Sequence, residues 1–292
     1  MRLTRYSDLP AFVARAEPFL LQREAEHCLQ LGILTTLQHG ETSNPRPPYL
    51  SLVRDDAGDI VLVAMATPPN NLILSHAAPM PEEELEEALS LVAGEVRNMA
   101  PNLPGVIGPD GVVDRYVARW QALTGQRAQV TRRERIYRLE RVLAPEGVAG
   151  HMRRIEETDR PALRAWLRAF SEEALGEPAD PRIDVGIDRR LRFESSGMYM
   201  WQVEGEPVAL AGYGGPTPHG MRIGPVYTPP EARGHGYASA LTAALSQMLL
   251  DSGRQFVFLF TDLANTASNH IYQAIGYQPI SDATEYRFGA PE

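Results

Sequence analysis

The feature that most constrains the fold of this chain is the stretch from Arg222 to Gly276, where strand-like and helix-like segments alternate. Ile223–Thr228 reads as a strand, and a glycine-containing turn leads from it into a helix. Phe256–Phe260 is continuously apolar, as expected of a strand buried on both faces. A second helix is predicted from about Asn265 to Ile275, and this order of elements predicts an α/β fold. The apolar residues that recur on one face of the first helix are Tyr237, Leu241, Ala244, Leu245, Met248 and Leu249.

The hexapeptide Arg233–Ala238, which opens the first helix, has the composition of a phosphate-binding turn. The first N–H groups of a helix lack internal partners and carry the positive end of the helix dipole, and glycines let a ligand approach the backbone closely. The turn therefore predicts a cradle for a phosphate or pyrophosphate. It lacks the Gly-Lys-Ser/Thr of a P-loop, and Ser239 stands where the Rossmann pattern requires Gly or Ala. An ordinary strand-to-helix turn explains the hexapeptide alone equally well.

A second motif lies in the second helix and the residues that follow it. Asn265, Ser268, Ile271, Tyr272, Gly276 and Tyr277 are spaced Asn-x-x-Ser-x-x-Ile-Tyr-x-x-x-Gly-Tyr. This pattern resembles the end of the GNAT (GCN5-related N-acetyltransferase) domain, where the family shows Asn-x-x-Ala-x-x-Leu-Tyr-x-x-x-Gly-Phe. Upstream, Arg-x-x-Gly-x-Ala at Arg233, Gly236 and Ala238 is similar to the acyl-coenzyme A signature of the family. Because both motifs occur in order, residues 197–288 are identified as a GNAT domain.

The resemblance implies acetyl-CoA as co-substrate and assigns roles to particular residues. Tyr272 is the expected catalytic acid that protonates the departing thiolate. Backbone N–H groups near the end of the strand are expected to stabilise the thioester oxyanion. His235 occupies a variable position of the family motif and is expected to face solvent. The residues expected to bind the cofactor are Val226, Tyr227, Thr228, Arg233, Gly234, His235, Gly236, Tyr237, Ala238, Ser239, Asn265 and Ser268.

Structural roles compete with these assignments. Asn265 is also a good helix N-cap, Tyr272 is also suited to the core, and Arg233 is also an ordinary surface residue at a helix start. Pro225 cannot donate to a sheet ladder, which fits either the bulged fourth strand of a GNAT sheet or a sheet edge. These alternatives remain open at the level of the sequence.

The reaction implied by the resemblance is acetyl transfer to a primary amine of a small molecule or peptide by direct attack in a ternary complex. The general base is not identified: Met221–Thr228 contains no carboxylate, and Asp262, Glu285 and a chain of waters are alternatives. A second hypothesis is a non-catalytic acyl-CoA-binding sensor or scaffold. The intact Tyr272 and Asn265 argue against it, because a binding protein does not require a thiolate acid.

The two halves of the chain share a register. Asp8 and Asp159 each stand two residues before a proline and differ by 151 (159 − 8), as do Gly125 and Gly276 (276 − 125). We therefore expect an α/β chain with an α+β-type mixed sheet, built as two tandem GNAT-like acyl-CoA N-acyltransferase domains at 1–144 and 151–292. Each is expected to be a central mixed, mostly antiparallel twisted sheet flanked by helices.

The same register predicts that the first domain lacks the cofactor chemistry. The positions equivalent to the turn Arg233–Ala238 fall on an acidic helix start, Glu82–Glu87, whose carboxylates repel a pyrophosphate. Gln121 stands at the position equivalent to Tyr272. Acidic residues also favour a helix N-terminus for structural reasons, so both interpretations hold together.

Composition limits the other classes of function. The net charge of −9 argues against a nucleic-acid partner, and the seven scattered His residues show no metal-ligand spacing. A single Cys excludes an internal disulfide framework, and no apolar run is long enough to span a bilayer. We expect a soluble cytoplasmic protein that needs no metal, with acetyl-CoA and an amine as its partners.

The edges of the sheets are predicted with less detail. Arg135–Leu139 alternates like a strand that closes the first domain. Tyr277–Ile280 and Glu285–Phe288 are predicted as two separate short strands at the end of the second. Val142–Gly150, with one proline and two glycines, is predicted as the linker.

Overall fold

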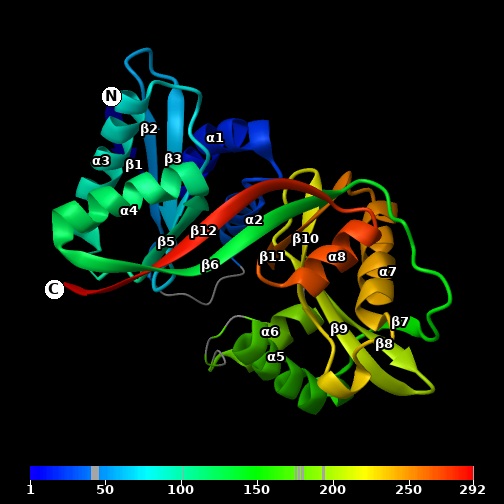
Figure 1. The fold of residues 1–292 in the computed structure, drawn as a ribbon. Helices are drawn as coiled ribbons and strands as arrows, with labels where there is room; N and C mark the ends of the chain where they lie inside the picture. The colour runs from blue at the N-terminus through cyan, green and yellow to red at the C-terminus, as the bar shows by residue number, and fades with distance from the viewer. Residues whose placement is uncertain are drawn as a thin grey trace. The chain divides into compact units, whose positions relative to one another are not determined.

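The computed structural model describes residues 1–40, 46–100, 102–174, 176, 178, 181–192 and 195–291 (Figure 1). The sequence also predicts a loop at Gly40–Pro48 and a helix over Asp184–Glu194, and both lie partly outside these residues. The chain divides into two compact units. Unit 1 comprises Met1–Ile136, Thr261–Ala264 and Ile280–Glu292, and unit 2 comprises Tyr137–Phe260 and Asn265–Pro279.

Unit 1 is a sheet in the order β1-β2-β3-β4-β5-β12-β6, accompanied by four α-helices among the described residues. β4 and β5 are parallel, while β1–β2, β2–β3, β3–β4 and β5–β12 are antiparallel. Buried side chains of α3 and α4 pack on one face and those of α1 and α2 on the other. The elements are β1 Arg2–Arg5, α1 Leu9–Leu20, a 3-10 turn Leu21–Arg23, α2 Cys28–Gln38, β2 Tyr49–Arg54, β3 Ile60–Ala66, β4 Leu72–Leu74, α3 Glu82–Met99, β5 Gly105–Pro109, α4 Asp110–Thr124, β6 Gln126–Leu139 and β12 Gln278–Pro291.

Unit 2 repeats this plan with strands in the order β6-β11-β10-β9-β8-β7. β10 and β11 are parallel, and β7–β8, β8–β9 and β9–β10 are antiparallel. The elements are β7 His151–Arg154, a 3-10 turn Glu157–Asp159, α5 Arg160–Ala174, α6 Ile183–Arg192, β8 Gly197–Val203, β9 Glu206–Gly214, β10 Gly220–Tyr227, a 3-10 turn Pro230–Ala232, α7 Tyr237–Asp251, β11 Phe256–Asp262 and α8 Thr266–Ala274. Both units have the mixed, mostly antiparallel sheet that the sequence predicted.

The repeat seen in the sequence is also present in the fold. β5 begins at Gly105 and β11 at Phe256, which differ by the same 151 positions (256 − 105). Gly125 and Gly276 follow the matching helices α4 and α8 and have left-handed backbone, with φ of 70° and 109°. A side chain at Gly276 would also meet the Arg141 carbonyl at 2.6 Å. Glycine is therefore required at the end of α8 by both its φ angle and its close packing.

Two strands are longer than the sequence predicted. β6 and β12 each contain 14 residues, so β6 begins at Gln126 and the two predicted strands between 277 and 288 are one continuous strand. Most of β6 before Ile136 is exposed or half-buried, and its polar residues hide the alternation on which strand prediction depends. Ile280–Glu292 packs in unit 1, where β12 pairs with β5, although the sequence analysis placed these residues in the domain 151–292.

Unit 1 contains a buried histidine, His27, whose protonation state is fixed by its contacts. Its Nε2 accepts a hydrogen bond from the His76 N–H at 3.0 Å, and its Nδ1 lies 2.8 Å from the Leu20 carbonyl oxygen. The ring is therefore neutral, with its proton on Nδ1 and donated to Leu20. Burial lowers the pKa of His27 to about 4, and burial also lowers the pKa of His76.

We predict that the free energy of unfolding decreases as the pH falls from about 6.5 to about 4. The unfolded chain binds a proton at His27 in this range and the folded chain does not, so acid favours unfolding. A shift of this size corresponds to about 3 kcal/mol. Urea unfolding at pH 7 and pH 4.5 measures it.

The variant His27→Gln should lose most of this pH dependence, whereas His39→Gln should keep it, because His39 is exposed. An equal pH dependence in wild type and His27→Gln would contradict the assignment.

Candidate active site

β10 leaves its parallel partner before it ends. Its pairing with β11 covers Gly220–Arg222, whereas β10 continues to Tyr227. Its register against β9 shifts between Ile223 and Val226, so the strand bulges at Gly224-Pro225. The sequence left open whether Pro225 marks a bulge or a sheet edge. It lies in a bulge, because β10 pairs with β9 on both sides of it.

A pocket of about 500 Å³ lies at this end of β10. It is lined by residues from the end of β10, the glycine turn, the start of α7, the start of α8 and the last turn of α5. Every predicted site residue except His235 contributes to it. These residues are Val226, Tyr227, Thr228, Arg233, Gly234, Gly236, Tyr237, Ala238, Ser239, Asn265, Ser268 and Tyr272.

His235 is exposed, as its variable motif position predicted, and its ring stacks on Tyr237 with centroids 5.3 Å apart. Its inclusion among the expected cofactor contacts has no support from the pocket geometry.

The glycine turn gives the pocket a row of backbone donors. Gly234 and Gly236 have φ of 83° and 78°, the left-handed region that favours glycine. The first internal hydrogen bond of α7 runs from the Ala240 N–H to the Gly236 carbonyl at 3.0 Å. The N–H groups of Tyr237–Ser239 precede it and point from the positive end of the helix. Thr228 also lines the pocket, and its buried Oγ1 has no hydrogen-bond partner among the described residues. This donor set fits a bound pyrophosphate.

The start of α8 brings the second motif to the same pocket. Asn265 is its N-cap, and its Oδ1 accepts the Ser268 N–H at 3.0 Å. Tyr272 is only 8% exposed and lies between Tyr137 and Tyr277, at centroid distances of 6.5 and 6.0 Å. Asn265 is thus the N-cap of α8, and Tyr272 is a core residue. Both residues also line the pocket.

Burial raises the pKa of Tyr272 to about 12, against a smaller opposing effect from a hydrogen bond with the Ser268 side chain. The phenol therefore keeps its proton at neutral pH.

The structure adds a residue that the sequence analysis did not find. Glu173, near the end of α5, lines the pocket and accepts hydrogen bonds from Arg233 Nη2 at 2.6 Å and from the Tyr227 hydroxyl at 2.9 Å. The Arg233 guanidinium and the Tyr227 hydroxyl hold the pKa of Glu173 below its usual value. Arg233 Nε also donates to the Thr228 carbonyl at 2.9 Å. The charge of Arg233 is thus balanced by Glu173. The positive charge that remains for an anionic ligand is that of the unpaired backbone N–H groups at the start of α7.

Neither carboxylate proposed as a general base is among the residues that line this pocket. Asp262 accepts the Ala264 N–H at 2.7 Å, and Glu285 accepts Asn71 Nδ2 at 2.6 Å and lies 3.6 Å from Arg132. Both belong to unit 1, whereas the pocket belongs to unit 2.

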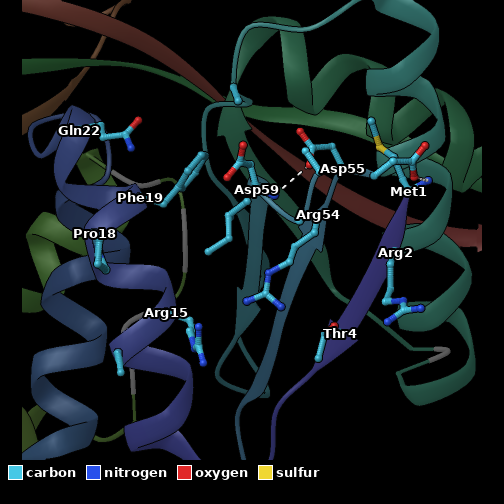
Figure 2. A pocket seen from close by; sticks show the side chains of 16 residues that line it. Met1, Arg2, Thr4, Arg15, Pro18, Phe19, Gln22, Arg54, Asp55 and Asp59 are labelled. Atoms are coloured by element: carbon cyan, nitrogen blue, oxygen red, sulfur yellow. Dashed lines mark hydrogen bonds and ion pairs between the residues drawn. The ribbon is translucent and has the colours of Figure 1, made fainter.

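A second, wider hollow of about 1050 Å³ lies in unit 1, beside α1 and the turn between β2 and β3 (Figure 2). None of the predicted site residues lines it. Several of its polar groups have partners within the unit: Arg54 donates to the Tyr6 hydroxyl, Asp55 accepts the Asp59 N–H, and Asp56 pairs with the amino terminus. It offers no grouping of side chains typical of a catalytic site.

A mixed sheet with a bulged strand, followed by a glycine turn at a helix start, defines unit 2 as a GNAT fold. Residues 160–277 match the Acetyltransferase (GNAT) family, in agreement with this fold. A mycothiol acetyltransferase of Rhodococcus erythropolis is 30% identical over 153 residues. The match covers 48% of this chain and 49% of that protein, so the chain spans about half the length of this relative.

Solved structures share the fold over the whole chain. A GCN5-related N-acetyltransferase from Sphaerobacter thermophilus has a TM-score of 0.64 at 17% identity, covering 98% of this chain and 95% of that one. A tandem GNAT protein from the clavulanic acid biosynthesis pathway has a TM-score of 0.58 at 12% identity, covering 100% and 99%. At these identities the likeness concerns the fold, and it supports the tandem arrangement. In the described part of the chain, no helix has the length and apolar character needed to cross a membrane.

We predict that Gly236→Asp weakens acetyl-CoA binding by at least about tenfold, which corresponds to roughly 1.4 kcal/mol. The substitution places a carboxylate beside the backbone donors of α7, where a phosphate is expected. Isothermal titration with acetyl-CoA measures the change.

Gly205→Asp is the matched control. It adds the same side chain at a φ of 91°, in the β8–β9 hairpin and not in the pocket lining. Wild-type affinity in Gly236→Asp, or an equal loss in Gly205→Asp, would show that the turn does not hold the cofactor.

Proposed function

We propose that the chain is an acetyl-CoA-dependent N-acetyltransferase that modifies a primary amine of a small molecule or peptide by direct attack in a ternary complex. The observation that carries the proposal is that one pocket combines the α7 backbone donors with the buried, protonated phenol of Tyr272. The match of residues 160–277 to the GNAT family and the similarity to a protein named mycothiol acetyltransferase support acetyl transfer.

Binding and orientation come from the backbone in this proposal. Acetyl-CoA supplies the thioester that is cleaved. The N–H groups of Tyr237–Ser239 hold its pyrophosphate, and Asn265 and Ser268 lie beside its pantetheine arm. Fixing the two reactants side by side converts a bimolecular step into an effectively unimolecular one, a large part of the catalysis expected here.

The bulge in β10 lets the end of the strand contribute to catalysis as well as to the sheet. Beyond Arg222 the strand no longer pairs with β11, although Val226 and Tyr227 still pair with β9. Backbone N–H groups near Val226–Thr228 that the parallel ladder does not use are therefore available to the pocket that these residues line. Donors fixed in this way stabilise the charge that develops on the carbonyl oxygen. The Tyr272 phenol provides the proton that the departing sulfur requires.

A non-catalytic acyl-CoA sensor remains the second candidate, because the cradle alone suffices for binding. A protonated phenol against the pocket has no use in a sensor. Release of free thiol from acetyl-CoA in the presence of an amine panel distinguishes the two functions, since a sensor binds without release.

We predict that Tyr272→Phe lowers kcat by about 10²–10⁴-fold, the usual contribution of a positioned acid, and leaves the Kd of acetyl-CoA unchanged. Steady-state thiol release and isothermal titration on the same sample measure the two quantities. Tyr199→Phe, a tyrosine on β8 outside the pocket lining, is the control. If Tyr272→Phe has wild-type kcat in single-turnover measurements, Tyr272 is not the acid.

We also predict that each chain binds one coenzyme A. The helix start of unit 1 that matches α7 is acidic: Arg115 pairs with Glu82 and Glu86, but Glu83 and Glu84 stay exposed on the first turn of α3. Carboxylates at this position oppose the helix dipole and repel a pyrophosphate. Isothermal titration should give a stoichiometry near one in wild type, and in Gly236→Asp this single site should be the one that is weakened. A stoichiometry near two would refute the assignment.

A further inference from the structure

Unit 2 contains a half-buried cation, Arg190 on α6, for which the described residues provide no anionic partner. Part of its side chain reaches the surface, but its Nε atom is buried and unpaired. Arg190 Nη1 donates a hydrogen bond to the Gly186 carbonyl oxygen at 3.2 Å. Burial, with the nearby charges of Arg189 and Arg222, lowers the pKa of Arg190 to about 10. A buried charge is unfavourable unless an opposite charge compensates it.

The neighbouring carboxylates do not compensate Arg190. Asp184 pairs with Arg164 at 2.7 Å, and Asp188 pairs with Arg160 at 2.8 Å. Glu173 of α5 is engaged by Arg233 and the Tyr227 hydroxyl. Within the described part of α5 and α6, these acids are therefore committed elsewhere.

The second cation, Arg222, lies on β10 on the same face of the sheet. Arg222 pairs with Gly214 of β9, and Tyr227 pairs with Leu210, four residues away. An even separation along β9 places Arg222 and Tyr227 on one face. Leu210 packs with Ile187 of α6 and Leu163 of α5, so this is the face that α5 and α6 cover.

The contacts of Arg222 also leave its charge uncompensated. Its guanidinium lies 5.9 Å from the centroid of the Phe260 ring, and no carboxylate pairs with it in the described residues. Tyr227, on the same face as Arg222, is one of the pocket residues, whereas neither arginine lines the pocket itself, so the two arginines lie beside it on the α5–α6 face.

We propose that Arg190 and Arg222 form an anion subsite for the acceptor, so that the substrate is an amine that also carries a carboxylate or phosphate. The proposal rests on the proposed function, because it assigns the acceptor to the same site. Guanidinium groups bind these anions with charge-assisted hydrogen bonds that are stronger than neutral ones.

The register also gives the span of this acceptor. Gly214 and Leu210 are separated by four residues, which is about 13 Å between the Cα positions of Arg222 and Tyr227 at the usual rise of a strand. The distance from the Arg222 guanidinium to the pocket end of β10 can be shorter than this Cα separation, because the arginine side chain is long. An extended amine with its anion about 10 Å away, the length of a tripeptide, fits this spacing.

The test compares acceptors that differ only in the anion, on protein saturated with coenzyme A so that the pyrophosphate cradle is filled. The probes are triglycine against triglycinamide and 6-aminohexanoate against 6-aminohexanamide. Isothermal titration should show the acid of at least one pair binding about tenfold more tightly than its amide in wild type. In Arg222→Gln and Arg190→Gln this ratio should fall to about two or less.

Two controls keep the result specific. Arg168→Gln removes an equal charge from the exposed side of α5 and should keep the tenfold ratio. Arg222→Lys should restore part of it, and circular dichroism checks folding of each variant. If Arg190→Gln fails to fold, Arg222→Gln alone decides. A wild-type ratio near one, no detectable binding of either acid, or a ratio that survives in Arg222→Gln would overturn the proposal.

Thiol release measured on the same samples separates this proposal from acetyl transfer. Selective binding of an acid without thiol release would support the anion subsite and remove the enzymatic function. Thiol release with equal kcat/KM for acids and amides would support acetyl transfer and remove the subsite.

Discussion

The candidate site depends on the backbone conformation at the start of α7. Two glycines with positive φ, Gly234 and Gly236, turn the chain so that the helix begins with its N–H groups toward the pocket. A helix start is the one place where consecutive backbone donors are unpaired by necessity, so it binds an anion without any cationic side chain. This explains how Arg233 can remain paired with Glu173 while the turn keeps its donors.

The other site features follow from departures from a regular sheet. The bulge at Gly224-Pro225 ends the pairing of β10 with β11 and frees the strand end for the pocket. Burial of Tyr272 between two aromatic rings removes water from its hydroxyl and raises its pKa to about 12. The same packing that makes Tyr272 a core residue therefore makes it a stable proton donor. The burial of Tyr272 in the core and its place in the pocket lining, which compete as explanations of the sequence, are thus compatible in the fold.

The two units share a plan but differ in what their helix starts present. α7 opens with glycines and unpaired donors, whereas α3 opens with glutamates, some of them tied to Arg115 and Arg119 on α4. A duplicated fold thus retains its sheet and helices while the electrostatics of one turn changes. The proposed cofactor chemistry therefore depends on this turn and on Tyr272 rather than on the fold that the two units share.

The sequence by itself determined the elements around the site, because the glycine turn, the apolar helix face and the Asn265–Tyr277 spacing are local patterns. It also determined the register of the repeat, and all but one of the site residues that it predicted line the pocket. The tertiary structure decided what depends on distant partners. The full length of β6 and β12 is set by pairing with neighbouring strands, and in β6 the exposed polar residues before Ile136 hide the strand signal. Glu173 meets Arg233 across 60 positions, and Arg190 lies near Arg222 across 32, with no local signal in either case. These charged groups can interact only because the sheet and the helices bring residues that are distant in the sequence close together.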